Sequence, residues 1–501
     1  MAESETNQNS TGEGSPNKRQ KIDKNGFQIF NDPIHGSIEL HPLLIAIIHT
    51  PQFQRLKDLK QLSFCYWIYP GASHNRFEHS LGTAHLCGKL IDTLQELHAG
   101  EYEITDKEAL CVKIAGLCHD LGHGPFSHFF DGVYIPHVKP ESKWTHEEAS
   151  CKLFETMLEE NTVVREKFRY FGLDGEEYKK LIKDLILGKD PEKDEVTRMC
   201  SKTDPNKPKW FLYEIVSNKR NGIDCDKFDY FARDCANVGV TSSFDYRRYF
   251  QNVRICEFDD QLQICVRDKE VFNLYELFHT RWSLHHRVYR HKTQAPIQDL
   301  VLKAFKEVDD ELKISEGIDT RRFTVLTDSL FYDIVESDPV KSSEEMKKAK
   351  ELLQRIQKRD LYKFCAETQP GTEQDCPEKE KVIKHLIRIS AGTLTEEQIF
   401  VDIVKINFGM GNKNPVDNVV FFNKSNETFK FRKEQVSQML PQNFHERYVR
   451  VYAQSREDSE SIERIQKCFE RFCEIRNYPK PRVPGVTSSN TVSSSDSTST
   501  G

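Results

Sequence analysis

A short stretch of the chain concentrates side chains that can bind a metal ion. Residues 118–128 read CHDLGHGPFSH and hold three histidines and one aspartate. The preceding segment, 110–117, is apolar, so we expect His119 and Asp120 at the inner end of a buried helix that the following glycines end. A buried, unpaired carboxylate is costly, and a divalent ion bound by imidazole and carboxylate would remove that cost. Taken alone, the pair is more typical of a helix end where the two side chains bond each other.

Two more residues strengthen the metal-binding interpretation. His79 lies upstream in the sequence NRFEHS, and Asp226 lies downstream in NGIDCDK. Together with His119 and Asp120 they would form a site of two histidines and two carboxylates. Such a site leaves coordination positions open for water and a phosphate oxygen. Nitrogen and oxygen ligands suit iron, manganese, zinc or magnesium, and they do not choose among these metals.

The order of these residues, H…HD…D, resembles the HD phosphohydrolase superfamily. More specifically, the chain resembles the vertebrate deoxynucleoside triphosphate triphosphohydrolases that join a sterile-alpha-motif domain to an HD domain. The resemblance rests on the segments DPIHG (32–36), TPQFQRL (50–56), PGASHNRFEHS (70–80) and DYFARD (229–234), and it extends from about residue 31 to about residue 481. About 30 residues precede it, too few for an independent core, so we expect the sterile-alpha-motif domain to be missing.

The resemblance implies a catalytic group beside the metal. It comprises His123, His128, Asp131 and His146, with His128 as the general acid and the last two as its supporting partners. The residue types fit these roles, because histidine can donate a proton near neutral pH and a carboxylate can orient it. Any one of these histidines is more often a hydrogen-bonding core residue. Four such groups beside a metal motif make a purely structural role a poor interpretation.

Basic residues near the motifs could hold a triphosphate. Arg76, Lys227 and Arg281 flank the metal-binding segments, and arginine binds phosphate through its planar fork. The resemblance implies that these three residues and Tyr230 contact the phosphates, and that four others surround the sugar: Gln61, Leu62, Asp234 and Tyr289. It further implies that Asp234 and Gln61 bind the 3′-hydroxyl and that Tyr289 excludes a ribose 2′-hydroxyl. The sequence alone would treat this tyrosine as an ordinary aromatic residue of a helix.

The resemblance also implies a homotetramer that is activated by GTP or a dNTP bound between subunits, with magnesium accompanying the nucleotide. The matching positions are Asn31, His49, Gln54, Lys57, Arg248, Arg267, Lys269, Asn273, His291, Lys292, Arg359, Lys363 and Lys424. Without the resemblance, such a set of mostly basic residues would be an ordinary solvated surface. One position departs from the family, which has an aspartate where this chain has His49. An acidic acceptor for guanine is lost there.

The composition describes an intracellular globular protein. Its 501 residues suffice for two or three domains, and no apolar run is long enough to span a membrane. The 14 cysteines show no paired spacing and no secretory signal precedes them, so we expect reduced thiols in the nucleus, the cytoplasm or both. The basic run at 18–21 could be a nuclear address, although residue type alone favours a solvated tail. The net charge of −7 argues against a coat of nucleic acid.

The sequence predicts a mainly helical fold with a smaller C-terminal α+β lobe. We expect disordered tails at 1–25 and 483–501, an HD catalytic domain at 26–293, and a regulatory or oligomerisation lobe at 294–482. Periodicity predicts helices at 41–62, 77–97, 105–117, from 144 onward, from 211 onward, and at 224–234, 269–291, 297–364 and 462–473. It predicts a hairpin at 253–266 and strands at 400–408, 419–422, 428–431 and 448–452, with loops at 184–208 and 367–381.

These features favour hydrolysis of deoxynucleoside triphosphates to deoxynucleoside and inorganic triphosphate. Water would attack the α-phosphorus while His128 protonates the 5′-oxygen. The resemblance extends this function to control of dNTP pools and to restriction of viral DNA synthesis. Two alternatives remain open: an HD-type phosphodiesterase or nuclease, and a non-catalytic single-stranded nucleic-acid binder. The latter needs a basic stripe interleaved with aromatic residues, which is not obvious here.

Overall fold

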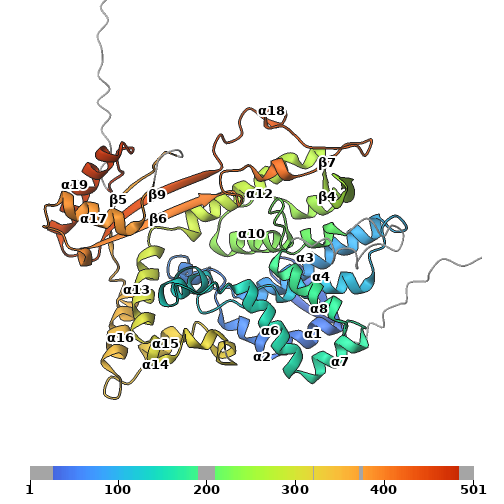
Figure 1. Ribbon diagram of the computed structural model, residues 1–501, viewed down its shortest axis with the longest axis horizontal. Coiled ribbons are helices and arrows are strands. Elements are labelled where there is room, and N and C mark those ends of the chain that lie inside the picture. The colour runs from blue at the N-terminus through green and yellow to red at the C-terminus, as the bar shows by residue number, and fades with distance from the viewer. Residues whose placement is uncertain (1–25, 190–208, 320, 372–375, 485–501) are drawn as a thin grey trace, which may run out of the picture.

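The part of the protein that the structure describes is mainly helical and carries three small sheets (Figure 1). This computed structural model describes residues 26–189, 209–319, 321–371 and 376–484. None of the helices among these residues is long and apolar enough to cross a membrane. The prediction of a mainly helical fold with a smaller sheet-containing C-terminal region is confirmed.

Three helices bring the metal-binding motif together. α3 (Arg76–Leu97) packs against both α4 (Asp106–Cys118) and α10 (Cys225–Val238). The side chains of Thr105 and Asp224 accept backbone N–H groups in the first turns of α4 and α10, and so fix where these helices begin. Gly116 lets α3 and α4 approach closely, because a Cβ at this position would lie 2.8 Å from the sulfur of Cys87.

Other helices accompany these three and carry further candidate residues. In chain order they are α1 (Pro42–Ile48), α2 (Pro51–Gln54), α5 (Ile135–Val138), α6 (His146–Glu160), α7 (Thr162–Tyr170), α8 (Glu176–Leu187), α11 (Tyr246–Phe250) and α12 (Val271–Leu284). A π-helical turn follows α12 at His285–Tyr289, and another precedes α5 at Phe130–Tyr134. Both π-helical turns carry candidate residues, Tyr289 in the first and Asp131 in the second.

Two of the sheets accompany the helical core. β1 (Gln28–Asp32) and β2 (Gly36–Leu40) form an antiparallel hairpin. β3 (Val253–Phe258) and β4 (Gln261–Arg267) form the predicted hairpin, which is extended by β7 (Phe421–Phe422) and β8 (Thr428–Phe429) in the order β3-β4-β7-β8. The second sheet therefore joins the middle of the chain to its C-terminal part.

The C-terminal region contains a helical layer and a separate sheet. α13 (Gln294–Glu307) packs against α16 (Glu344–Gln357), with α14 (Asp309–Leu312) and α15 (Leu330–Val335) beside them. The sheet has the order β5-β9-β6, formed by Lys363–Thr368, His445–Ala453 and Ile399–Asn407. α17 (Lys379–Ile389) and α19 (Ser459–Arg476) pack on it and share its hydrophobic core, and the short α18 (Lys433–Val436) precedes β9 (Figure 1).

Several local predictions were wrong. β1 and β2 were not predicted, and β5 and α17 occupy parts of a region where a loop was expected. The segment at 211–216 begins as a 3-10 helix, and α8 extends to Leu187, inside the expected insertion at 184–208. The rest of that insertion and the two predicted tails lie outside the described residues, except for 483 and 484. The charged residues of β5 misled the prediction, because Glu367 is neutralised by Arg450 of the neighbouring strand at 3.1 Å.

Candidate active site

Two histidines and an aspartate meet where α3, α4 and α10 converge. Nε2 of His79 lies 3.2 Å from Nε2 of His119 and 3.1 Å from Oδ1 of Asp226. Nδ1 of His119 lies 2.9 Å from the carbonyl oxygen of Gly116, which can only accept a hydrogen bond. Nδ1 of His119 therefore carries the proton, and the lone pair on its Nε2 faces His79.

The same tautomer is imposed on His79. Its Nδ1 donates to the carboxylate of Asp229 at 2.7 Å, so its Nε2 also presents a lone pair to the cluster. Burial lowers the pKa of His79, but the hydrogen bonds to Asp226 and Asp229 outweigh burial and raise it to about 10. The negative charge around His79 therefore favours a positive charge at its Nε2, where either a proton or a metal ion can bind. Two inward-facing imidazole nitrogens and a carboxylate are a donor set that fits a divalent metal ion.

Asp120 lies between this cluster and the guanidinium group of Arg76. Its Oδ2 accepts a hydrogen bond from Nη1 of Arg76 at 2.7 Å and lies 3.4 Å from Nε2 of His79. Its Oδ1 lies 3.5 Å from Nε2 of His119 and 3.2 Å from Nε2 of His123. Burial would raise the pKa of Asp120, but Arg76 and the histidines hold it well below its usual range. The structure thus places the expected fourth ligand beside both histidines and adds an ion pair with Arg76 that the sequence did not reveal.

Asp229 supports the metal cluster from outside, and sequence reasoning gave it no role. Besides His79, it accepts a hydrogen bond from Nε2 of His35 at 2.6 Å and two from Arg233 at 2.8 and 2.9 Å. Arg233 also donates to Asp32 at 2.9 Å. A chain of buried polar contacts therefore runs from the β1–β2 hairpin to the metal cluster.

One spacing in the sequence could have identified Asp229. It lies three residues after Asp226 on α10, so both carboxylates lie on one side of the helix. A Cβ at Gly82 would lie 1.8 Å from a carboxylate oxygen of Asp229, so α3 can approach this aspartate only because residue 82 is glycine.

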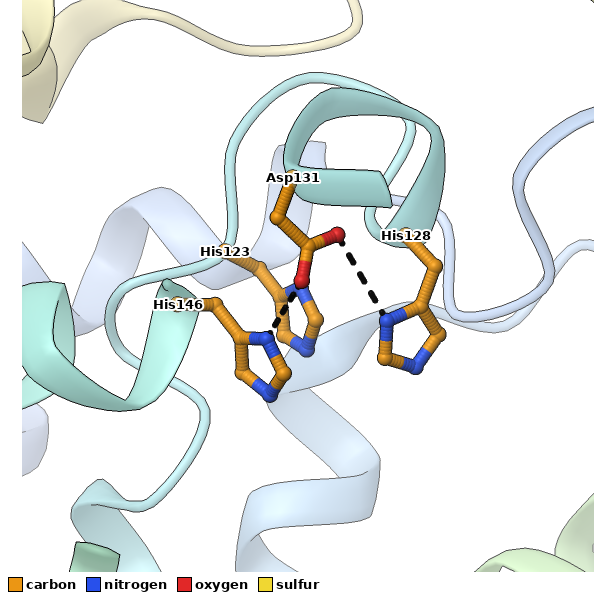
Figure 2. A group of neighbouring side chains, drawn as sticks. All are labelled: His123, His128, Asp131 and His146. Carbon is orange, nitrogen blue, oxygen red and sulfur yellow. Dashed lines mark hydrogen bonds and ion pairs between the residues drawn. The ribbon is translucent and has the colours of Figure 1, made fainter. Parts of the chain in front are cut away.

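The four residues of the expected catalytic group also lie together (Figure 2). Asp131 stands between two histidines: its Oδ2 accepts from Nδ1 of His146 at 2.6 Å, and its Oδ1 lies 3.6 Å from Nδ1 of His128. The ring of His123 stacks on that of His146 at 4.0 Å. The side chain of His128 is 69% exposed, whereas His123 is buried. His128 is therefore the member of the group that is open to an incoming substrate.

The charges of this second cluster suit proton transfer. Burial would raise the pKa of Asp131, but the nearby rings of His128 and His146 hold it well below its usual range. Burial would lower the pKa of His146, but Asp131 raises it. The result is a carboxylate that stays ionised between two histidines, one of which is exposed.

Both clusters could bind a metal by donor geometry alone, since the ligand atoms within each lie within 4.8 Å of one another. Their electrostatics differ. Burial and then the guanidinium of Arg76 hold the pKa of His123 well below its ordinary value, so positive charge is disfavoured at this member of the second cluster. The first cluster carries an excess of carboxylates. The structure therefore favours the metal in the cluster of His79, His119 and Asp226.

The expected substrate residues surround these clusters. On α10, Lys227 pairs with Asp224 at 2.9 Å, and Tyr230 lies 3.3 Å from the guanidinium of Arg281. Asp234, near the end of the same helix, accepts the hydroxyl of Tyr289 at 2.6 Å. Its other oxygen accepts from Nε2 of His74 at 2.7 Å, a contact that was not predicted.

Gln61 and Leu62 lie next to Arg76. Both are buried, and the carbonyl oxygen of Gln61 accepts from Nη2 of Arg76 at 3.3 Å. The structure therefore connects the expected sugar residues to the guanidinium that binds Asp120.

The expected activator residues fall into several groups on different elements. Lys57 donates to Gln54 at 2.7 Å, near the exposed His49 at the end of α1. Arg248 of α11 pairs with the buried Glu270 at 2.7 Å, and that carboxylate also accepts from Asn273. Asn31 belongs to β1, and Arg267 and Lys269 lie at the end of β4 and just after it.

The remaining activator residues lie in or near the C-terminal region. Arg359 donates to the carbonyl of Trp67 at 2.8 Å, and Lys292 lies over the ring of Phe364. The ring of His291 contacts that of Tyr69. Lys363 begins β5, and Lys424 lies in the turn between β7 and β8.

Comparison with known proteins agrees with the site. A family model described as HD domain matches residues 76–209. The deoxynucleoside triphosphate triphosphohydrolase SAMHD1 of Homo sapiens is 44% identical over 477 residues, which cover 91% of this chain and 75% of that protein. SAMHD1 of Danio rerio is 43% identical, and the match covers 93% of this chain and 77% of that protein. The SAMHD1 homologue of Dictyostelium discoideum is 36% identical, and the match covers 91% of this chain and 82% of that protein.

The helical fold and the paired histidine–aspartate clusters define an HD-domain hydrolase. Within that class, the chain belongs to the SAMHD1 family of deoxynucleoside triphosphate triphosphohydrolases. The family predicted from the sequence motifs is therefore confirmed.

Proposed function

We propose that the protein hydrolyses deoxynucleoside triphosphates to deoxynucleoside and inorganic triphosphate. The metal ligands would be His79, His119, Asp120 and Asp226. The observation that carries this proposal is the pair of Nε2 atoms that face each other with their tautomers fixed, beside a second cluster built for proton transfer. Membership of the SAMHD1 family supports the choice of substrate.

A divalent ion such as iron, zinc or manganese would supply Lewis-acid chemistry and lower the pKa of a water molecule. The side chains provide the remaining steps. Asp131 and His146 orient His128, which delivers a proton to the 5′-oxygen as the bond from this oxygen to the α-phosphorus breaks. The leaving group is then a neutral deoxynucleoside, and water supplies the new oxygen of the triphosphate.

The substrate would lie between these clusters and α10. Lys227 and Arg281, with Tyr230 and Arg76, provide the charges and hydroxyl that bind the triphosphate. Asp234, with Gln61, binds the 3′-hydroxyl beside Leu62. Tyr289 is held against Asp234 by its own hydroxyl, so its ring is fixed where it would oppose a 2′-hydroxyl.

Regulation by nucleotides extends this proposal. GTP or a dNTP, with magnesium, would bind to the groups around His49, Arg248 and Arg359 and drive formation of a homotetramer. The distribution of these groups over different elements supports binding between subunits, because each surface presents only part of a phosphate-binding set. In a cell, such an enzyme would lower dNTP pools and thereby limit viral DNA synthesis.

Product analysis tests the reaction. Purified, metal-loaded protein is incubated with dATP, with and without GTP, and the products are separated. We expect deoxyadenosine and triphosphate in equal amounts, and much slower cleavage of ATP, because one hydroxyl decides the fit of the sugar. Release of deoxyadenosine monophosphate would instead identify a phosphodiesterase. Equal rates on dATP and ATP would refute the role given to Tyr289.

A double variant tests the metal site. His119→Ala with Asp120→Ala should lose both bound metal and turnover while the helical content, measured by circular dichroism, is retained. A matched control is His98→Asn, which alters a buried histidine at the end of α3 that accepts from the backbone of Ile255. Full activity in the double variant would contradict the assignment.

A further inference from the structure

A carboxylate from the C-terminal region holds two segments of the candidate active site. Asp328 lies just before α15, far in sequence from the expected metal ligands and catalytic histidines. Its Oδ1 accepts the backbone N–H of Phe126 at 2.6 Å, and its Oδ2 accepts that of Lys60 at 2.8 Å. Phe126 lies two residues before His128, and Lys60 directly precedes Gln61.

The backbone at Phe126 and Ser127 is strained. Their φ angles are 58° and 54°, in the left-handed region that non-glycine residues rarely adopt. Such a conformation is unfavourable for non-glycine residues and persists where the surrounding structure enforces it. The neighbouring Gly124 is tightly enclosed, because a Cβ there would lie 2.2 Å from the ring of Phe130. The turn that delivers His128 therefore needs an external restraint.

A second set of bonds joins the same two segments. The hydroxyl of Ser127 donates to the carbonyl of Lys60 at 2.7 Å and accepts from Nε of Arg76 at 3.0 Å. Arg76 in turn binds Asp120. The strained turn, the segment before Gln61 and the metal motif are thus one connected hydrogen-bond network, with Asp328 at its outer end.

The segment that carries Asp328 is itself anchored to the HD-type core. The guanidinium of Arg55 donates to the carbonyl oxygens of Leu326 and Leu121 and lies 4.5 Å from the centre of the Phe323 ring. Burial raises the pKa of Asp328 to about 6, although the two amides, Lys60 and Arg55 act in the opposite direction. The Asp328 carboxylate therefore makes these contacts at a position that is partly shielded from water.

We propose that Asp328 is a positioning residue for dNTP hydrolysis, which keeps His128 and Gln61 in place by holding the amides of Phe126 and Lys60. Asp328 does not touch the substrate in this arrangement. The inference rests on the proposed role of His128 as the general acid. It means that a segment outside the HD motif helps to hold the catalytic residues in position.

The Asp328→Asn variant tests this inference. An asparagine side chain has one acceptor oxygen and one donor NH₂ group, so it cannot accept from both amides. We expect kcat for dATP to fall ten- to a hundredfold, since a displacement of about 1 Å is enough for such a loss. The control is Asp309→Asn, because Asp309 also accepts a backbone N–H, that of Ser315, together with the hydroxyls of Ser315 and Tyr134, but contacts neither Phe126 nor Lys60.

A substrate analogue separates positioning from general loss of structure. In a dATP analogue with sulfur as the bridging 5′-atom, the thiolate leaves without being protonated, so a misplaced general acid matters little. Asp328→Asn and His128→Ala should both regain most of their relative activity on this analogue. An unchanged kcat for dATP in Asp328→Asn, or an equal loss on both substrates, would overturn the inference.

The same experiment distinguishes the two proposals. Full activity of His128→Ala on dATP would overturn the general-acid role, whatever the result for Asp328. A strong loss in His128→Ala with none in Asp328→Asn would overturn only the positioning role. If Asp328→Asn does not fold, hydrogen exchange of the unmodified protein decides: the Phe126 amide should be protected as well as the amides of α4, and rapid exchange there would refute the contact.

Discussion

The orientation of His79 depends on a single carboxylate. Asp229 holds Nδ1 of this proposed ligand, and partners of this kind typically change metal affinity by about 10–100-fold. We therefore predict that Asp229→Asn binds metal about 10–100-fold more weakly, measured by titration against a competing chelator. The comparison variant is Glu108→Gln, which removes a buried carboxylate paired with Lys209 at the other end of α4. Equal metal affinities for Asp229→Asn and the unmodified protein would count against the assignment.

Residue type and order were enough to identify the expected metal and catalytic residues as candidates. His79, His119 and Asp226 stand out because imidazoles and carboxylates in that order are typical of a metal site. Residue type alone did not identify Asp229, for which only its spacing from Asp226 was a signal, and nothing in the sequence indicated Asp328. A lone aspartate is usually solvated, and these two matter only because Gly82 and the strained turn at Phe126 bring particular groups against them.

The start of α1 depends on an uncharged histidine. Nδ1 of His41 accepts the N–H of Leu43 at 3.2 Å as the N-terminal cap. Burial, followed by the charges of Lys113 and Lys167, lowers the pKa of His41 to about 4. The unfolded chain, in which histidine titrates near its ordinary pKa of about 6.5, therefore binds a proton before the folded protein does. The contribution of His41 to stability is complete above about pH 6.5 and is lost as the pH falls towards 4.

The His41→Asn variant tests this dependence. Asparagine keeps a capping oxygen but does not titrate, so its free energy of unfolding should fall less between about pH 7 and about pH 4.5 than that of the unmodified protein. The expected difference is of the order of 1–3 kcal/mol, measured by urea denaturation at each pH. Other groups titrate in both proteins and cancel in the comparison. Parallel pH profiles would show that His41 does not titrate as described.

Elements with strong local patterns were predicted, and elements that depend on tertiary partners were not. The sequence predicted α3, α4, α10 and α19 because their apolar spacing and capping residues are local. β5 was missed because its residues Lys363 and Glu367 are charged, and only pairing with β9 accounts for their place in a sheet. Tyr289 was placed on a regular helix, whereas the structure has a π-helical turn there.

The response of the whole assembly to nucleotides should depend on His49. The family's aspartate would accept two hydrogen bonds from guanine, each of about 1.5–3 kcal/mol when charge-assisted, whereas neutral histidine offers one acceptor and no charge. We predict that His49→Asp increases the advantage of GTP over ATP as activator. The measurement is the initial rate of dATP hydrolysis with each activator, together with tetramer content from light scattering.

A neutral substitution and the unmodified protein provide the comparison. His49→Asn should leave the preference for GTP nearly unchanged, because it adds no charge. If the unmodified protein is activated by GTP and not by ATP, another residue recognises the guanine base and the role given to His49 is wrong.

The buried apolar side chains of the described residues form two large hydrophobic cores and two small clusters. The first core joins residues from the N-terminal hairpin through α16 and on to β7 and β9, and the second lies between the β5-β9-β6 sheet, α17 and α19. The boundaries at 293 and 482 stay predictions. The first core shows why composition could not locate them: α13 and α16 share apolar contacts with the helices of the HD motif, so no polar linker marks a border among the described residues there.

The arrangement of α10 limits how this protein can change over generations. This one helix carries Asp226, Lys227, Tyr230 and Asp234, and it also carries Asp229 and Arg233, which bond each other. A single codon inserted between Asp226 and Asp234 would rotate every later residue by about 100° around the helix axis. The residues expected to contact the metal, the phosphates and the sugar would then no longer face their present directions relative to one another. Descendants of this gene can therefore alter α10 by replacing residues, while insertions and deletions within it are removed by selection.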